Sequence, residues 1–119
     1  KKYSKWIDLV TVMGNVNSDV IAKLSGVVLI GNMSNNNYDY KETTVDIAKK
    51  YPDRVIGVVT QYRINLNGII NMTPGINKDK FSVDDQNYRR VEDVDTDIVI
   101  VGRGIYNSDN YVDSAEMYR

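Results

Sequence analysis

The residue best suited to ligand chemistry is Arg103, which stands between Gly102 and Gly104 near the end of the sequence. Glycine lets a backbone approach a ligand closely, and a guanidinium is a rigid donor of paired hydrogen bonds. This tripeptide therefore predicts a binding site. The alternative is a structural role, in which Arg103 forms an ion pair with Asp109 or Asp113 further along the chain.

Two residue types that carry much of enzyme chemistry are absent from the sequence. The 119 residues include no His, which excludes the Ser-His-Asp arrangement and the commonest general base near neutral pH. They include no Cys, which excludes thiolate nucleophiles, disulfides and Cys-based zinc sites. Acid–base chemistry in this chain must rest on carboxylates, Lys or Tyr.

Length and charge limit the class of protein. The length predicts a single domain, residues 1–119, since domains typically have about 100–200 residues. The 15 Lys and Arg balance 16 Asp and Glu, which argues against the basic surface of a nucleic-acid-binding protein. No apolar run reaches the ~18 residues of a membrane span, and we find no signal peptide. We therefore expect an intracellular, cytoplasmic protein without nucleic-acid or membrane partners.

Five short apolar runs rich in β-branched residues recur along the chain. Runs of this kind are typical of strands that are buried on both faces in a parallel sheet covered by helices. We expect strands at residues 7–12, 26–30, 55–59, 68–72 and 97–101.

The segments between these runs predict helices. Ser18 is a candidate N-cap for a helix that continues to Leu24. A second helix is expected over residues 40–51, where Pro52 stops it, and a third after Ser108. The stretch between the third and fourth runs is too short for a full crossover helix. This alternation predicts an α/β fold with about five parallel strands.

Five parallel strands leave the two outer strands without neighbours. A (β/α) barrel closes with eight strands, and an open edge presents a row of unpaired backbone groups. The chain is therefore either a doubly wound sheet or part of something larger. In the second case we expect another protein chain or a missing N-terminal half to cover the edges, or a homo-oligomer to form.

Segments at the predicted strand ends resemble orotidine 5′-phosphate decarboxylase of the eukaryotic type. The resemblance is carried by Asn71-Met72-Thr73-Pro74-Gly75, by Gln86-Asn87-Tyr88-Arg89 and by residues 97–106, in the family's order and near its spacing. Residues 6–10, 29–34, 44–48 and 55–57 are similar to the family's fourth strand, fifth strand, following helix and sixth strand, and residues 115–119 to its final helix.

The resemblance implies a partial TIM barrel that contains strands four to eight. The family converts orotidine monophosphate to uridine monophosphate, a step of pyrimidine biosynthesis, without a metal or cofactor. Its Asp-x-Lys-x-x-Asp motif, whose Lys delivers the proton to the carbon that loses CO2, does not occur in these 119 residues. We therefore expect no catalytic residue here and no decarboxylation by this chain alone.

Six residues match the family's substrate-binding positions. By resemblance two of them hold the base and four hold the phosphate: Ser34 and Pro74, then Gln86, Tyr88, Gly102 and Arg103. Three also fit plain structural roles, because Ser34 heads an Asn-rich turn, Pro74 begins an ordinary turn pair, and Tyr88 is suited to aromatic packing.

Other positions depart from the family pattern. Val12-Met13 stand where the family usually has Ala-His, and Asn32 stands in place of an acid. Asp85, preceded by Asp84, replaces a Gly beside the phosphate loop. Two carboxylates at this position would repel a phosphate by about 1 kcal/mol or more each.

Three hypotheses about function follow. The leading one is a degenerate, non-catalytic member of the decarboxylase family, kept as a structural or interaction module. The second is the C-terminal part of an orotidine 5′-phosphate decarboxylase whose catalytic strands come from another chain or a missing region. The third is a binder of uridine or orotidine monophosphate that performs no catalysis.

Overall fold

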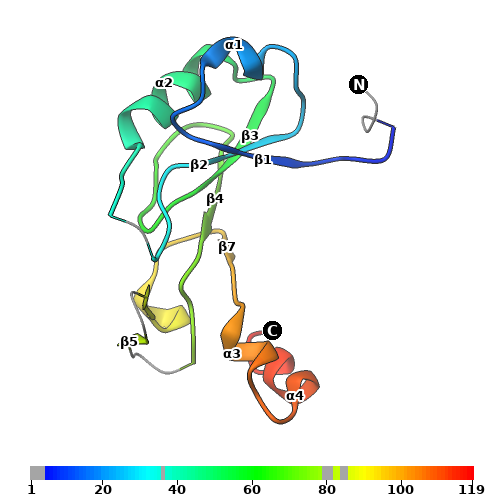
Figure 1. The fold of residues 1–119 in the computed structure, drawn as a ribbon, viewed down its shortest axis with the longest axis vertical. Helices are drawn as coiled ribbons and strands as arrows, with labels where there is room; N and C mark the ends of the chain where they lie inside the picture. Colours follow the sequence, from blue (N-terminus) through cyan, green and yellow to red (C-terminus); the bar gives the residue numbers. More distant parts are fainter. Residues whose placement is uncertain (1–4, 36, 79–81, 84–85) are drawn as a thin grey trace.

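Five parallel strands form the main sheet of the computed structural model (Figure 1). The structure describes residues 5–35, 37–78, 82–83 and 86–119. This arrangement confirms the predicted α/β fold and is consistent with a partial TIM barrel, in which consecutive strands lie side by side. In sheet order the strands are β1 (Val10–Met13), β2 (Val27–Ile30), β3 (Val55–Val59), β4 (Ile70–Thr73) and β7 (Ile98–Val99).

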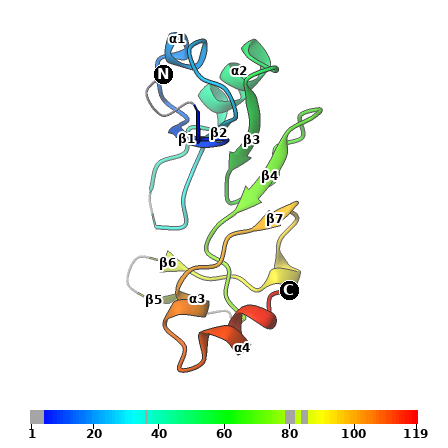
Figure 2. The ribbon, with the colours of Figure 1, turned by 90° about the vertical axis from the view of Figure 1, so that its right-hand side faces the viewer.

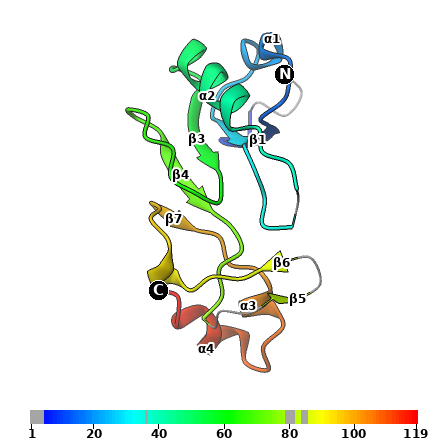
Figure 3. The same ribbon diagram turned by 90° about the vertical axis from the view of Figure 1, so that its left-hand side faces the viewer.

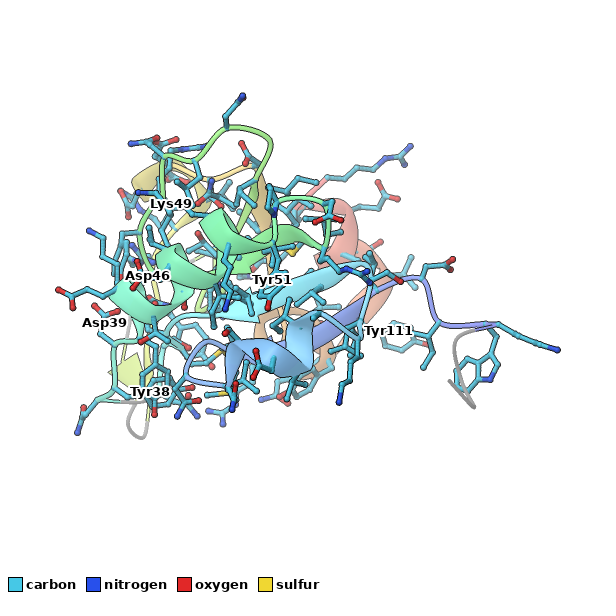
Figure 4. The ribbon with its side chains drawn as sticks, turned by 90° about the horizontal axis from the view of Figure 1, so that it is seen from above. Tyr38, Asp39, Asp46, Lys49, Tyr51 and Tyr111 are labelled. Atoms are coloured by element: carbon cyan, nitrogen blue, oxygen red, sulfur yellow. The ribbon has the colours of Figure 1, made fainter. Side chains whose placement is uncertain are left out.

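Two helices, α1 (Ser18–Ile21) and α2 (Lys41–Lys50), cover one face of the sheet. The polar side of α2 carries Asp46 and Lys49, which are exposed (Figure 4). Full burial of an aliphatic side chain stabilises the fold by about 1.5–3 kcal/mol, so this core holds the helices on the sheet. The core is formed by Ile21, Ile47 and Ala48 of the helices together with Val27, Leu29, Val55 and Val58 of β2 and β3.

The opposite face of the sheet is also apolar. Strand register places a continuous row of side chains across it, made of Met13, Ile30, Val59, Met72 and Ile98. Met13 and Ile98 are 38% and 45% exposed, which is high for large apolar side chains. In a closed barrel this face is the packed interior, so the exposure of its two outermost side chains agrees with a sheet that forms part of a barrel.

Both helices begin and end close to the predicted positions, with one correction at a cap. The N-cap of α1 is Asn17, whose side chain accepts a hydrogen bond from the Asp19 N–H at 3.0 Å, so the prediction of Ser18 as N-cap was wrong. α1 also ends at Ile21 rather than Leu24. α2 ends at Lys50, before Pro52, as the sequence predicts.

The outer strands are shorter than their apolar runs. β1 begins at Val10 rather than residue 7, because its neighbour β2 begins at Val27, the residue that pairs with Val10. β7 covers two residues of the predicted 97–101, since it pairs with β4 only at Met72 and Thr73. Hydrophobic pattern marks an apolar segment, whereas a strand exists only where a neighbouring strand supplies hydrogen bonds.

The C-terminal third forms a second group of elements at the opposite end from α1 and α2 (Figures 2 and 3). The helix α3 begins at Arg103, shortly after the predicted strand at residues 97–101. The elements are the antiparallel pair β5 (Ser82–Val83) and β6 (Gln86–Asn87), the 3-10 helix η1 (Val91–Asp93), α3 (Arg103–Tyr106) and α4 (Tyr111–Glu116).

The molecule is more extended than a compact domain of its length. Its radius of gyration is 15.4 Å and its principal extents are 43 × 31 × 26 Å. A compact chain of this length has a radius of about 13–14 Å. In the part of the chain that the structure describes, every helix is too short or too polar to cross a membrane.

An ion-pair cluster ties the loop before β4 to the segment before β7. The Arg63 guanidinium binds Asp95 at 2.9 Å and Asp97 at 3.0 Å. The second oxygen of Asp97 accepts the Asn71 N–H at 2.7 Å. This backbone hydrogen bond and then the Arg63 guanidinium hold the pKa of Asp97 below its usual value of 3.8. The cluster therefore fixes β7 beside β4 through charge as well as through pairing.

We predict that Asp97→Asn reduces the acid sensitivity of the fold. Because folding lowers the pKa of Asp97, its ionised form stabilises the folded state above the unfolded-state pKa, and this contribution is lost as pH falls below about 4. Urea unfolding between about pH 5 and pH 2 should show a smaller loss of unfolding free energy for Asp97→Asn than for the wild type. The exposed Asp109→Asn serves as control, and equal losses in wild type and Asp97→Asn would contradict the prediction.

Candidate functional site

A cavity of about 210 Å³ lies at the carboxyl ends of β2, β4 and β7. Four separate segments form its wall: the residues after β2, the turn after β4, Tyr88 after β6, and the stretch from β7 into α3. This end of a parallel sheet is where barrel enzymes place their sites. The residues around it are Met33, Ser34, Pro74, Gly75, Ile76, Tyr88, Ile100, Gly102, Arg103 and Tyr106.

Five of the six predicted binding residues line this cavity, although they come from distant parts of the chain: Ser34, Pro74, Tyr88, Gly102 and Arg103. The backbone of the sixth, Gln86, lies in β6, and its side chain is outside the described part of the structure. Asp84 and Asp85 also lie outside the described residues, so their repulsion of a phosphate stays a prediction. The structure thus brings the five residues together, while their binding roles stay predictions.

The two glycines around Arg103 have different surroundings. Gly102 lies at the start of α3, and the nearest atom to a Cβ built on it would be a ring carbon of Tyr106 at 3.4 Å. A Cβ on Gly104 would lie 2.6 Å from the Tyr118 hydroxyl and 3.1 Å from the Asn77 amide nitrogen. Gly104 is therefore needed for the approach of two side chains, whereas Gly102 leaves open backbone at the cavity.

Tyr118 connects the C-terminal end of the chain to the segment after β4. Its hydroxyl accepts the Lys78 N–H at 2.7 Å and donates to the side-chain oxygen of Asn77 at 3.4 Å. Asn77 is buried, so its side-chain amide gains from this hydrogen bond. Sequence reasoning missed the role of Tyr118, since its partner Lys78 lies 40 residues away in the sequence. The local signal for it was Gly104, whose lack of a side chain leaves room for the Tyr118 hydroxyl.

The turn after β4 is an ordinary turn pair that also lines the cavity. Gly75 has φ of +74°, a conformation that glycine adopts without strain, so Pro74-Gly75 is a turn pair. The same two residues also form part of the cavity wall. The Pro74 carbonyl accepts the side-chain N–H of Gln61 at 3.2 Å, and the Gly75 carbonyl accepts the Arg89 N–H at 2.9 Å. The turn is thereby fixed from outside the cavity.

Tyr88 is both packed and part of the cavity. Its side chain is 6% exposed, in agreement with the aromatic-packing alternative, and it also lines the cavity. Asn32, next to the Met33-Ser34 pair, is 8% exposed, and its side-chain oxygen accepts the Gln61 N–H at 2.7 Å. The neutral Asn32 therefore joins the ends of β2 and β3.

The loop that carries Ser34 is closed at its far end by aromatic and polar contacts. The Tyr40 N–H donates to the Gly31 carbonyl at 2.9 Å, and the Tyr38 and Tyr40 rings stack with centroids 4.6 Å apart. The Tyr62 hydroxyl donates to Asp39. Burial, followed by the hydrogen bond to Asp39 and its charge, raises the pKa of Tyr62 above its usual range, so this donor keeps its proton at neutral pH.

Comparison with known protein families identifies a match over nearly the whole chain. Residues 1–118 match the model of the orotidine 5′-phosphate decarboxylase / HUMPS family. A uridine 5′-monophosphate synthase of Caenorhabditis elegans is 34% identical over 142 aligned residues, which cover 100% of this chain and 29% of that protein. An orotidine 5′-phosphate decarboxylase of Pichia kudriavzevii is 30% identical. The alignment covers 88% of this chain and 49% of that protein.

The coverage differs between the two kinds of relative. The chain spans about half the length of the curated decarboxylases that it matches, such as those of Pichia kudriavzevii and Candida boidinii, at 49% and 47%. It spans less than a third of the uridine 5′-monophosphate synthases of Caenorhabditis elegans and Bos taurus, at 29% and 28%. These proportions agree with the predicted correspondence to the C-terminal half of a decarboxylase.

We predict that Tyr118→Phe loosens the segment that begins at Asn77. Loss of the hydroxyl leaves the Lys78 N–H without its acceptor, and a hydrogen bond of this kind contributes about 1 kcal/mol. Amide hydrogen exchange at Lys78 should become faster, and urea unfolding should show a loss of about 1 kcal/mol. The matched control is Tyr111→Phe, whose side chain is exposed. An unchanged exchange rate at Lys78 would rule out the contact.

Proposed function

Because this chain belongs to the orotidine 5′-phosphate decarboxylase / HUMPS family, we propose that its cavity binds uridine or orotidine monophosphate but that its own residues do not decarboxylate the nucleotide. One observation carries the proposal: five residues at family binding positions line a single cavity. They lie at the carboxyl ends of parallel strands, where a (β/α) barrel holds its ligand.

The phosphate side of the proposed site consists of Arg103 with the open backbone of Gly102. A guanidinium can bind two phosphate oxygens at once, and the Gly102 N–H can donate to a third because no side chain shields it. Tyr88 also lines the cavity and carries a hydroxyl that can donate. These donors supply positive charge and directed hydrogen bonds, which is what a phosphate dianion requires.

The base side of the proposed site consists of Ser34 and Pro74. A hydroxyl can both donate to and accept from the edge of a pyrimidine, and the flat ring of a proline can lie against its face. Met33 and Ile76 add apolar lining next to them. A cavity of about 210 Å³ is below the range of about 300–1,000 Å³ usual for whole-ligand pockets, so part of the nucleotide would extend from it.

Decarboxylation needs a proton donor beside the carbon that loses CO2; the titratable side chains in the described lining of this cavity are Tyr88, Arg103 and Tyr106. The described lining residues include no Lys, Asp or Glu. The sequence holds no Asp-x-Lys-x-x-Asp motif. These two observations support binding without catalysis by the chain's own residues.

A second candidate function is decarboxylation by a completed barrel. It is favoured by the sheet itself, since within the described residues β1 and β7 are the outer strands, and Met13 and Ile98 at the two ends of the apolar row are exposed. Strands that carry the Lys and Asp residues, from another chain or a further region, would cover both.

The alternative of a purely structural module is favoured by Asn32, which stands in place of an acid and whose side chain accepts the backbone N–H of Gln61.

We predict that uridine monophosphate raises the melting temperature of the chain and that Arg103→Ala abolishes the shift. A ligand at about 100 times its Kd adds about 2.7 kcal/mol, which corresponds to roughly 10 °C for a domain of this size. The control is Arg90→Ala, which removes an exposed guanidinium that pairs with Glu92 and Asp93. No shift of the wild type at millimolar ligand rejects the proposed function.

We predict that the purified chain alone releases no CO2 from carboxyl-labelled orotidine monophosphate. A second assay mixes the chain with a fragment of the Pichia kudriavzevii enzyme that contains its catalytic motif. This assay distinguishes binding without catalysis from decarboxylation by a completed barrel. Release of CO2 by the mixture but not by either part supports a completed barrel. Release by the chain alone contradicts the proposal that its own residues only bind.

A further inference from the structure

A chain of hydrogen bonds runs behind the cavity and joins the ends of three strands. After β2, the Asn32 oxygen accepts the Gln61 N–H at 2.7 Å. After β3, the Gln61 side-chain N–H donates to the Pro74 carbonyl at 3.2 Å. The oxygen of the same amide accepts from the Arg89 guanidinium at 3.0 Å. Gln61 is therefore the central member of a connection between the residues beside Ser34, the turn after β4, and Arg89.

The amide of Gln61 can fit this place in one orientation only. A guanidinium has donors and no acceptor, and the Pro74 carbonyl has an acceptor and no donor. The amide oxygen must therefore face Arg89 and the amide nitrogen must face Pro74, as the structure has it. No other neutral side chain of this length offers both groups at one end.

Arg89 extends the connection to the phosphate side of the cavity. Its N–H donates to the Gly75 carbonyl and its carbonyl accepts the Asn77 N–H, both at 2.9 Å. The preceding residue, Tyr88, lines the cavity, whereas the Arg89 side chain reaches Gln61 behind it. Partial burial lowers the pKa of Arg89, which remains charged at neutral pH. The backbone next to Tyr88 is thus held by two hydrogen bonds to the segment after β4, and the Arg89 side chain adds a contact with Gln61.

We propose that the Gln61–Arg89 pair is a positioning device that sets the separation between the base wall at Pro74 and the phosphate-side residue Tyr88. This positioning role rests on the proposed function and determines which ligands the cavity selects. A ligand that contacts both walls, such as uridine monophosphate, gains from the fixed separation. Inorganic phosphate or uridine contacts only one wall and therefore gains nothing from the fixed separation.

The experiment measures the Kd of the full chain for uridine monophosphate, inorganic phosphate and uridine, by titration calorimetry. The variants are Gln61→Ala, Arg89→Met and the double variant, with Arg90→Met as the control that removes a neighbouring charge at the surface. Gln61→Glu retains an acceptor for Arg89 and loses the donor to Pro74, so it tests the two hydrogen bonds separately. Circular dichroism and urea unfolding of every variant report whether the fold is kept.

The expected result is a loss of about tenfold in affinity for uridine monophosphate in each single variant, with the Kd for inorganic phosphate changed less than about threefold. The double variant should bind no more weakly than the weaker-binding single variant, because both substitutions break the same Gln61–Arg89 contact. Gln61→Glu should fall between Gln61→Ala and the wild type, and Arg90→Met should equal the wild type.

Three results would overturn the positioning role. If uridine monophosphate binds the wild type and all folded variants equally, the pair positions nothing, while the proposed function stands. If the variants lose all three ligands in parallel with unfolding, the pair is merely structural. If the wild type binds neither uridine monophosphate nor inorganic phosphate, the proposed function fails and the positioning role fails with it.

Discussion

The parallel pairing of β2 with β3 is the interaction on which the rest of the structure depends. The two strands align Leu29 with Val58 and Ile30 with Val59, so one set of side chains enters the core under α1 and α2 while the next set faces the opposite side. Because parallel strands need cover on both faces, the second apolar face requires a further layer or a closed barrel. The same pairing aligns the strand ends and so brings the loops after β2, β3 and β4 to one edge.

Small residues at this edge let the elements approach closely. A Cβ on Gly14 would lie 2.1 Å from the buried Thr44 hydroxyl, and a Cβ on Gly31 would lie 2.8 Å from the Thr60 methyl group. The ends of β1 and β2 therefore sit directly against α2 and β3, which leaves the chain after Gly31 to turn toward Ser34. The cavity is a consequence of this close packing, since its walls are the segments that emerge from the aligned strand ends.

Sequence reasoning succeeded where the signal is local and failed where the partner is distant. The run at residues 55–59 coincides with β3, because a buried central strand is apolar along its whole length. The apolar run at residues 7–12 predicted too early a start for β1, since the first residue of β1 is set by the start of β2 rather than by the residues of β1 itself. The predicted binding residues could be placed by resemblance, whereas the Gln61–Arg89 contact joins residues 28 apart and has no local pattern.

The two contacts that sequence reasoning missed fix the two ends of the same segment. Tyr118 holds it at Lys78, and Gln61 holds it at Arg89, while the Asn77–Arg89 and Gly75–Arg89 backbone hydrogen bonds close its base. Among the described residues, Tyr88 is therefore held through the neighbouring Arg89 and its contact with Gln61, and Arg103 through α3, where Gly104 meets Tyr118. In the proposed function, a phosphate in the cavity would therefore meet Tyr88 and Arg103 on backbone that contacts away from the ligand already hold.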